Sequence, residues 1–431
     1  MCYAIPGRVV EIKGRIAVVD YFGEHRNVLN DFIDLKQGDY VYAQGGIVVE
    51  KVSEKYAKQI LDYWKDKFFQ LKRVDQKISE RKGKPNPKLK NIFEKAEKGS
   101  ILNRSEILEL IRMENKNEME TLFKFANGLR QRYLKNASCV HGIIEFSNYC
   151  ISNCAYCGIR KDNKKLIRYR MDIDEIVQIA EHAVNDLSFK ALVLQSGEDP
   201  WYTTEKLVEI IKRVRKKCGV LLFMSIGTRS FNCYKKMYEA GARGVLIRFE
   251  TSNPDLYKNL HINSKSDFNK RLELIKYTKK LGYVVATGFL IGLPGQTEED
   301  LINDVMLTKS LNPDMYSFGP FIPHPETPLS KAKTVDIETV LKVIAVCRLL
   351  DPNAKILVTT ALETLDKKNG KRLGLLSGAN SLMINITPER YKKLYSIYPN
   401  RAGIDKSVKE NIDETLELLY SLGRAPTDLG I

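Results

Sequence analysis

The sequence has little cysteine and no long apolar run. Its 431 residues include only eight cysteines. That is too few for the disulfide framework of a secreted protein, so we expect a reducing compartment. No stretch approaches the roughly 18 apolar residues of a membrane-spanning helix, and no basic segment precedes an apolar one near Met1. We therefore expect a cytoplasmic protein with no membrane partner.

The chain also has too few acidic residues to balance its basic ones. Its net charge is +16, from 69 Lys and Arg against 53 Asp and Glu. The stretch from Lys65 to Lys98 is especially basic but contains few aromatic residues, which nucleic-acid interfaces use for stacking. We interpret this stretch as a solvated, partly helical segment and do not expect a nucleic-acid partner.

The first 75 residues are rich in short β-type runs separated by glycine. The runs are Val9–Ile12, Ile16–Tyr21 and Tyr40–Tyr42. This spacing predicts a small β-barrel, followed by an amphipathic helix. Residues 76–90 are basic and polar with Gly83, Pro85 and Pro87, which predicts a linker. Helices are then expected over 91–138, leading into a second domain that extends to residue 431.

From residue 142 onward, apolar runs alternate with helical patterns. The predicted helices include Glu175–Asn185, Thr204–Lys217, Phe268–Leu281 and Glu299–Leu311. The predicted strands are Ile143–Phe146, Ala191–Gln195, Val220–Ser225, Val245–Glu250, Val284–Ile291, Met315–Gly319, Ile356–Thr360 and Ser381–Asn385. Eight strand–helix units with strands this apolar predict an α/β fold, a parallel (β/α)8 TIM barrel.

Polar residues recur within these predicted strands or at their carboxyl ends, where a barrel assembles its active site. They are Glu145, Gln195, Ser225, Arg248, Glu250, Thr359, Thr360 and Asn385. Each could be an internally paired core residue, but eight at one rim indicate a binding cavity.

Three cysteines lie within eight residues, in the pattern Cys150-x3-Cys154-x2-Cys157 with Tyr156 before the last. A structural zinc site needs a fourth ligand nearby, and none follows within twenty residues. Unpaired or zinc-binding cysteines remain the alternative. The motif resembles the cluster loop of radical S-adenosylmethionine (radical SAM) enzymes. The resemblance implies a 4Fe–4S cluster with one open iron, which binds S-adenosylmethionine (SAM) and cleaves it to a 5′-deoxyadenosyl radical.

The barrel region resembles the HydE maturases of FeFe-hydrogenase assembly, in the biotin synthase group. The resemblance rests on residues 143–150, 193–200, 292–297 and 319–325. The SAM-binding residues that it implies are Tyr156, Gly197, Glu198, Ser225, Glu250, Arg271, Gly292 and Leu293. The substrate-binding residues that it implies are Gln195, Arg248, Thr359, Thr360 and Tyr395.

Four of these assignments have simple structural alternatives. Gly197-Glu198 suits a turn, and so does the glycine-rich segment around Gly292. Arg271 suits a helix surface. Arg248 suits an internal ion pair with Glu145 or Glu250.

The first 65 residues resemble the HypC/HupF hydrogenase-assembly chaperones. In that family the cysteine at position 2 holds iron, so the resemblance implies an iron ligand at Cys2. A histidine of the family is replaced here by Gln44, and the alternative is a docking domain whose Cys2 is inert. We hypothesise that the linker lets Cys2 approach the barrel mouth or presents the small domain to an outside partner.

Together the resemblances imply a radical SAM enzyme of hydrogenase metallocofactor assembly. Its substrate would be an iron-bound cysteine carrying carbon monoxide and cyanide. Its partners would be other hydrogenase maturases and an electron donor. A HydE-type accessory cluster is not expected, because the last cysteine is Cys347. The alternatives are a mutase like methylornithine synthase, acting on an amino acid, and a non-catalytic iron carrier.

Overall fold

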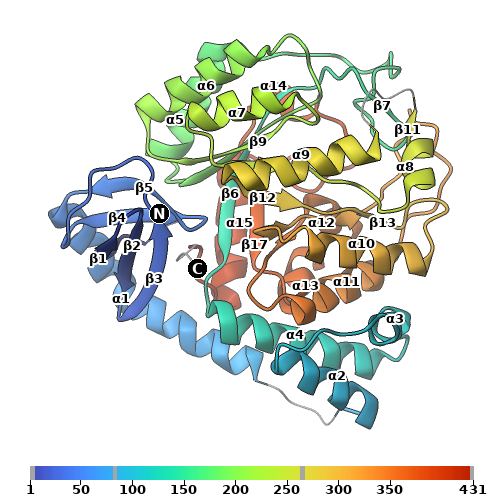
Figure 1. Cartoon of the computed structure of the whole chain (residues 1–431), viewed down its shortest axis with the longest axis horizontal. Coiled ribbons are helices and arrows are strands. Elements are labelled where there is room, and N and C mark those ends of the chain that lie inside the picture. The colour runs from blue at the N-terminus through green and yellow to red at the C-terminus, as the bar shows by residue number, and fades with distance from the viewer. Residues whose placement is uncertain (1–4, 81–84, 263–266, 428–431) are drawn as a thin grey trace.

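The computed structural model describes residues 5–80, 85–262 and 267–427. Two closed barrels of different size make up the fold (Figure 1). The small one is all antiparallel except for one parallel pair, and the large one is parallel throughout. Within these described ranges, no helix has the length and apolar character needed to cross a membrane.

The small barrel confirms the predicted N-terminal fold. Its strands close in the order β1-β2-β3-β5-β4. They are β1 (Gly7–Lys13), β2 (Ile16–Tyr21), β3 (Glu24–Leu29), β4 (Tyr40–Gln44) and β5 (Ile47–Val52). Gly14 and Gly23 have left-handed φ angles of 60° and 88° at the two hairpin turns β1–β2 and β2–β3, a conformation that glycine adopts without strain.

Helix α1 (Glu54–Ser79) leaves the small barrel and overturns the predicted linker. The linker was expected over residues 76–90, yet 76–79 continue α1 and 87–90 open α2. The end of α1 is anchored because Asp75 accepts hydrogen bonds from Arg130 Nη2 at 2.6 Å and Arg424 Nε at 3.1 Å. All three side chains are buried. Residues 76–79 and 87–90 of the predicted linker are therefore helical, and the end of α1 is held against the second domain.

Three helices then lead into the large barrel, as predicted for residues 91–138. They are α2 (Pro87–Glu97), α3 (Arg104–Arg112) and α4 (Lys116–Leu134). In Figure 1 they lie along the lower side of the molecule.

The large barrel confirms the predicted (β/α)8 architecture. Its closed order is β10-β12-β14-β16-β17-β6-β8-β9, all parallel. The strands are β6 (Cys139–Ser147), β8 (Ala191–Ser196), β9 (Leu221–Ser225), β10 (Gly244–Leu246), β12 (Val284–Thr287), β14 (Met315–Tyr316), β16 (Lys355–Val358) and β17 (Ser381–Asn385).

Four predicted strands are shorter than expected. Residues 245–250 form a strand only to Leu246, and Thr360 belongs to α12 rather than to β16. Residues 284–291 and 315–319 break, and their second halves pair separately as β13 (Leu290–Ile291) and β15 (Gly319–Pro320). The two segments pass so closely at the break that only glycine fits at position 288, where a Cβ would lie 2.3 Å from Ser317 O.

The remaining elements surround the barrel or cross its carboxyl end. They are β7 (Asn153–Cys154), α5 (Ile173–Asn185), α6 (Thr204–Lys217), α7 (Phe231–Glu239), α8 (Pro254–Leu260), β11 (His261–Ile262), α9 (Phe268–Leu281), α10 (Glu298–Ser310), α11 (Ile337–Leu350), α12 (Thr360–Leu365), α13 (Gly370–Leu376), α14 (Glu389–Lys392) and α15 (Val408–Ser421).

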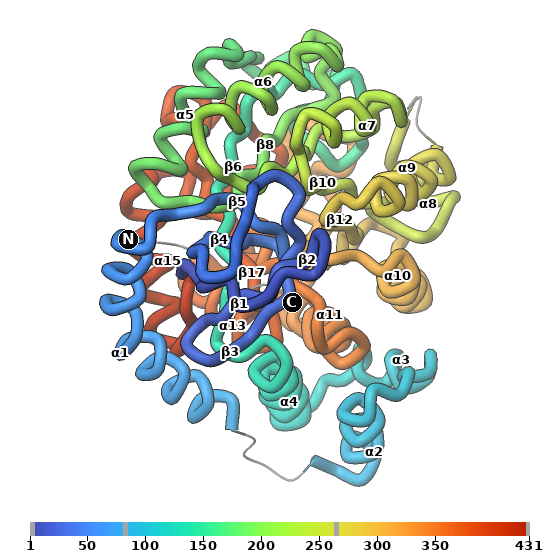
Figure 2. The backbone as a smooth tube through the Cα atoms, turned by 60° about the vertical axis from the view of Figure 1, so that its left-hand side comes forward, coloured from blue at the N-terminus to red at the C-terminus, as the bar shows by residue number. Residues whose placement is uncertain are grey.

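The small barrel docks on the amino end of the large barrel, in front of its strands in Figure 2. Side chains of β4 and β5, among them Tyr42 and Ile47, share an apolar cluster with Leu221 and Val284, which begin β9 and β12. Gly45, at the β4–β5 turn, approaches so closely that a Cβ there would lie 2.7 Å from Leu221 Cδ2. The hairpin therefore closes the amino end of the barrel.

This docking places the small barrel away from the mouth of the large barrel, and the hypothesis that the linker brings Cys2 there stays a prediction. The mouth lies at the carboxyl ends of the strands, and β7 and β11 stand there at the far side of the molecule from the small barrel (Figure 1). Two ion pairs hold the docked position, Asp31–Arg243 at 2.8 Å and Glu50–Lys190 at 2.6 Å. Cys2 itself lies outside the described residues.

Candidate functional site

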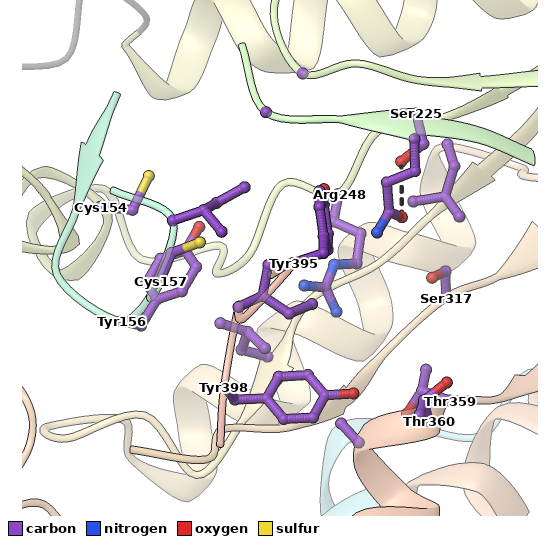
Figure 3. Close-up of a pocket in the computed structure, with 18 of the residues that line it drawn as sticks. Cys154, Tyr156, Cys157, Ser225, Arg248, Ser317, Thr359, Thr360, Tyr395 and Tyr398 are labelled. Carbon is purple, nitrogen blue, oxygen red and sulfur yellow. Dashed lines mark hydrogen bonds between the residues drawn. The ribbon is translucent and has the colours of Figure 1, made fainter. Parts of the chain in front are cut away.

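A cavity of about 310 Å3 opens at the carboxyl end of the large barrel. All eight polar residues predicted at the rim line it: Glu145, Gln195, Ser225, Arg248, Glu250, Thr359, Thr360 and Asn385. In Figure 3 the cysteine loop occupies one side of the cavity and Ser225, Thr359 and Thr360 the other, with Arg248 between. The cavity thus has a sulfur-bearing half and a polar half.

Cys150, Cys154 and Cys157 all line the first half of this cavity. Their loop is held by backbone contacts to distant segments, Ala155 N to Leu260 O at 2.7 Å and Gly158 N to Ile397 O at 2.9 Å. Only glycine fits at position 158, because a Cβ there would lie 2.1 Å from Ser396 O. The loop is therefore fixed by the fold before any metal binds.

Two polar side chains stabilise the same loop through hydrogen bonds to backbone carbonyls. Asn148 Nδ2 donates to the carbonyls of Ile167 and Leu394, both at 2.8 Å. Arg168 donates to the carbonyls of Asn148 and Ile159, at 2.5 and 2.8 Å. These contacts hold the loop without using the side chains of Cys154 and Cys157, while Cys150 Sγ accepts a hydrogen bond from Glu198 N at 3.4 Å.

Burial raises the pKa of all three thiols. For Cys157 it raises the pKa to about 12, with the neighbouring Cys150 adding to the effect. For Cys154 burial is again the main cause of the raised pKa, followed by Cys157 and Cys150. For Cys150 burial comes first and Glu198 second in raising the pKa. Three thiolates here need a cationic centre to compensate them.

Three thiols on one cavity wall are donors of the kind that an iron–sulfur cluster uses. In the part of the chain that the structure describes, no three His, Cys, Asp or Glu side chains are grouped to hold a single metal ion. An iron–sulfur cluster places each cysteine on a different iron, so its ligands stand further apart. The three cysteines therefore supply the donors that such a cluster uses.

Glu198 lies beside the cysteines with its carboxylate fixed. It accepts hydrogen bonds from Ser152 Oγ and from Thr228 N, both at 2.7 Å. The preceding residue must be glycine, since a Cβ on Gly197 would lie 2.3 Å from Tyr149 O. Gly197 and Glu198 are therefore more than a turn, because they place a carboxylate and backbone carbonyls on the cavity wall.

Arg271 is a buried residue of the cavity wall, so its surface alternative is wrong. Only 11% of its side chain is exposed, Nη1 donates to Arg248 O at 2.8 Å, and Nη2 lies 3.5 Å from Glu198 Oε1. Although burial acts to lower its pKa, the nearby Tyr257 and Glu198 leave the pKa above its usual value. Arg271 is thus a fixed cation beside the cysteine loop.

Glu250 completes this half of the cavity from an unusual backbone conformation. Its φ angle is +68°, in the left-handed region that costs energy for a residue other than glycine. Glu250 Oε1 lies 3.4 Å from Arg248 Nε, as the ion-pair alternative for Arg248 predicted. Glu250 Oε2 and Arg271 Nε are buried and have no hydrogen-bond partner among the described residues. An unused acceptor and an unused donor on one wall fit the ammonium and carboxylate of an amino-acid ligand.

The polar half contains the predicted substrate residues. Ser225 Oγ donates to Gln195 Oε1 at 3.4 Å, so Ser225 lies with this half although the resemblance assigned it to SAM. The Thr359 hydroxyl caps α12 by accepting from Leu362 N at 3.3 Å. Tyr395 is 2% exposed, and burial raises its pKa well above the usual value.

Sequence reasoning missed three residues of this half, Ser317, Tyr398 and Arg401. Arg401 pairs in bidentate fashion with Glu145, the Nη1–Oε2 distance being 3.2 Å. Glu145 also accepts from Asn385 Nδ2 at 2.9 Å. Glu145 is therefore not the partner of Arg248. Arg401 lies 256 residues after Glu145, so no local pattern could indicate the pair.

Two predicted cofactor residues lie outside the cavity. Gly292 N and Leu293 N donate to Gln296 Oε1 at 2.7 and 3.2 Å, and neither residue lines the cavity. Gly292 has a φ of +81°, and the Leu293 side chain is buried. Their segment is a turn, which was the simpler alternative. Tyr156 does line the cavity, with its hydroxyl 3.1 Å from His261 Nε2.

Family comparisons agree with this geometry in both barrels. The model of the radical SAM superfamily matches residues 144–307, and that of the biotin and thiamin synthesis associated domain matches 317–424. The model of the HupF/HypC family matches residues 1–64. The matches therefore divide between the small barrel and the large one.

Two curated relatives and one solved structure cover most of the chain. The [FeFe] hydrogenase maturase subunit HydE of Thermotoga maritima is 40% identical over 78% of this chain and 95% of its own length. The 3-methylornithine synthase of Methanosarcina acetivorans is 30% identical over 77% and 93%. The crystal structure of methylornithine synthase (PylB) matches with a TM-score of 0.69 and 26% identity, covering 78% of this chain and 97% of that one.

Proposed function

The chain belongs to the radical SAM superfamily, in the family of the FeFe-hydrogenase maturase subunit HydE, and we propose that it uses SAM in hydrogenase metallocofactor assembly. The observation that carries the proposal is one cavity lined by three cysteines, a fixed carboxylate and a buried arginine, with a polar wall opposite. When bound, a 4Fe–4S cluster supplies the electron that splits SAM into methionine and a 5′-deoxyadenosyl radical.

We assign Cys150, Cys154 and Cys157 as the cluster ligands. Three thiolates leave one iron without a protein ligand, as chelation of SAM requires. The thiols lose their protons when the cluster binds, because iron compensates the charge that burial disfavours. The braced loop holds them in place without a fourth cysteine.

The SAM residues follow from the charges beside that loop. Glu198, Glu250 and the carbonyl of Gly197 are acceptors for the SAM ammonium group. Arg271 is a donor for the SAM carboxylate, and a guanidinium suits a carboxylate because both are planar and bidentate. Tyr156 would lie next to a cluster held by the neighbouring Cys154 and Cys157, and its hydroxyl is 3.1 Å from His261 Nε2. Water is excluded by the apolar cluster that Tyr156 shares with Leu260 and Phe321.

We assign the polar half to the substrate. The hydrogen-bond donors of this half suit an anionic or cyanide-bearing compound. They are Arg248, Gln195, Ser225, Thr359, Thr360 and Tyr395. An iron-bound cysteine carrying carbon monoxide and cyanide has this chemistry, and the HupF/HypC match at residues 1–64 gives a second link to hydrogenase assembly. The partners on this proposal are other hydrogenase maturases and a one-electron donor.

The test is anaerobic reconstitution with iron and sulfide, followed by reduction in the presence of SAM. We expect methionine and 5′-deoxyadenosine in equal amounts. Cys154→Ala should abolish both products, whereas Cys218→Ala, at the C-cap of α6, should leave them unchanged. Absence of 5′-deoxyadenosine from a protein that carries its full iron would refute the enzyme and favour the iron-carrier alternative.

A second candidate is an amino-acid mutase, favoured by the likeness to methylornithine synthase over the whole barrel. The same carboxylates and guanidinium groups would also hold an amino acid. A mutase converts its substrate to an isomer of unchanged mass, so a new chromatographic peak with the mass of an amino acid in the starting mixture distinguishes it. Turnover of an iron-bound cysteine with no isomerised amino acid supports the first candidate.

A further inference from the structure

The junction between the two barrels contains a buried group of polar side chains that do not line the cavity. Gln44 is the last residue of β4, and Cys139 and His141 lie at the start of β6. They are 1%, 2% and 1% exposed. Residues 139 and 141 share one face of their strand, because side chains alternate along a strand. His141 precedes Glu145 of the cavity wall by four residues, about 13 Å along the strand.

The three side chains converge on one point. Cys139 Sγ lies 3.1 Å from His141 Nε2, and Gln44 Nε2 lies 3.4 Å from the same sulfur. Gln44 Oε1 is buried and has no hydrogen-bond partner among the described residues. A 180° rotation of the Gln44 side-chain amide exchanges the positions of Nε2 and Oε1. Oε1 would then lie beside the Cys139 thiol, where Nε2 lies now.

We propose that Gln44, Cys139 and His141 bind one divalent transition-metal ion of the zinc class. Thiolate, imidazole and amide oxygen are ligands that such ions accept. In a tetrahedral site with ordinary Zn–S and Zn–N bonds, the sulfur and nitrogen donors stand about 3.5 Å apart. The distances of 3.1 and 3.4 Å are within a few tenths of an ångström of that value.

Binding requires no redox change. The Cys139 thiol releases one proton and its sulfur forms the metal bond, while His141 binds through its neutral ring and Gln44 through its oxygen. The fourth coordination position of a tetrahedral ion would be filled by a ligand other than Gln44, Cys139 and His141. The donors come from both barrels, so the ion joins the small barrel to the large one. An ion that binds only the assembled junction stabilises it by linkage.

The first test uses reconstituted protein with its iron–sulfur cluster in place. After anaerobic equilibrium dialysis against zinc, we expect one zinc ion per chain in addition to the iron. Cys139→Ala and His141→Leu should weaken zinc binding at least tenfold. Cys218→Ala is the matched control, because Cys218 is also buried but lies at the C-cap of α6, and it should bind zinc as the unmodified chain does.

A gain of affinity separates a metal site from a hydrogen-bonded junction. Gln44→Glu places a carboxylate, a stronger zinc ligand than an amide, at the same position. We expect zinc binding at least tenfold tighter and a Tm that rises more on adding zinc than in the unmodified chain. Gln44→Leu should weaken zinc binding and reduce the rise in Tm on adding zinc. If Gln44 is purely structural, neither substitution should change zinc affinity.

Cobalt substitution provides a readout that does not depend on any variant folding. We expect Co²⁺ to give the intense absorption of a cobalt–thiolate bond in the unmodified reconstituted chain. Failure to retain zinc and to give this band overturns the proposal. The proposal is also overturned if the Cys139→Ala and His141→Leu variants retain as much zinc as the unmodified chain does.

Discussion

The Glu145–Arg401 pair on the cavity wall gives the largest stability effect that we expect from one substitution. Glu145 is fully buried and Arg401 is 7% exposed in its side chain. Arg401→Met fills a similar volume but leaves the Glu145 carboxylate with Asn385 as its remaining side-chain donor. Breaking a buried ion pair by removing one partner costs about 3–5 kcal/mol, because the other charge stays buried.

Removing the Glu145 charge as well should recover part of the unfolding free energy that Arg401→Met loses. In the double variant Glu145→Gln, Arg401→Met no charge is left uncompensated, so we expect a loss of less than about 2 kcal/mol. Urea unfolding of the cluster-free protein, followed by circular dichroism, measures the change in unfolding free energy. The matched control is Arg390→Met, because Arg390 pairs with Glu175 at the surface, and it should cost less than about 1 kcal/mol.

Two results would contradict the argument. An Arg401→Met loss no larger than that of Arg390→Met would mean that solvent in the cavity hydrates Glu145. A double variant less stable than either single one would mean that packing, rather than charge, dominates at this wall. In both cases separating the Glu145 and Arg401 charges would cost little stability, so both side chains could bind substrate.

The remaining predictions concern the cofactors and the junction. Iron analysis after reconstitution should give about four iron atoms per chain, and about eight would reveal a second cluster. Arg271→Ala should weaken SAM binding by about 1.5–3 kcal/mol without loss of iron, measured by equilibrium dialysis, and unchanged affinity would remove Arg271 from the SAM site. Although burial acts to raise it, the hydrogen bonds from Arg243 and Arg15 hold the pKa of Asp31 below its usual value. The stability that Asp31 contributes is therefore complete above the unfolded value of about 3.9 and is lost as the pH falls through the folded pKa. Asp31→Asn should flatten this acid loss in urea midpoints measured against pH, and an unchanged acid limb would contradict it.

Local patterns predicted the barrel well. The helices over Thr204–Lys217 and Phe268–Leu281 end where the sequence placed them, because apolar periodicity and caps are local signals. The eight rim residues were found from one rule, that barrel sites form at the carboxyl ends of strands. The strand over residues 245–250 was too long because residues 247–250 continue the apolar pattern after strand pairing ends at Leu246.

The contacts between distant segments could not be predicted in the same way. Arg401 belongs to an irregular segment after α14, and only the closed fold brings it to Glu145. The docking of the β4–β5 hairpin depends on two surfaces that meet only after both barrels have formed. Nothing in the sequence showed that the turn at Gly45 meets the other barrel. Arg271 was placed in the SAM site by resemblance, since Lys270-Arg271 alone is an ordinary helix surface pattern.

The path of α1 sets where this chain can be divided. The family match for the small barrel ends at residue 64, but α1 continues to Ser79 and its last turns are bound to Arg130 and Arg424 through Asp75. A cut at the family boundary would sever the helix in its middle and expose the apolar cluster that Tyr42 and Ile47 cover. The large barrel released in this way should aggregate, whereas the whole chain carries both parts in fixed one-to-one proportion. Homologues that encode the two parts as separate proteins would need another way to cover that surface.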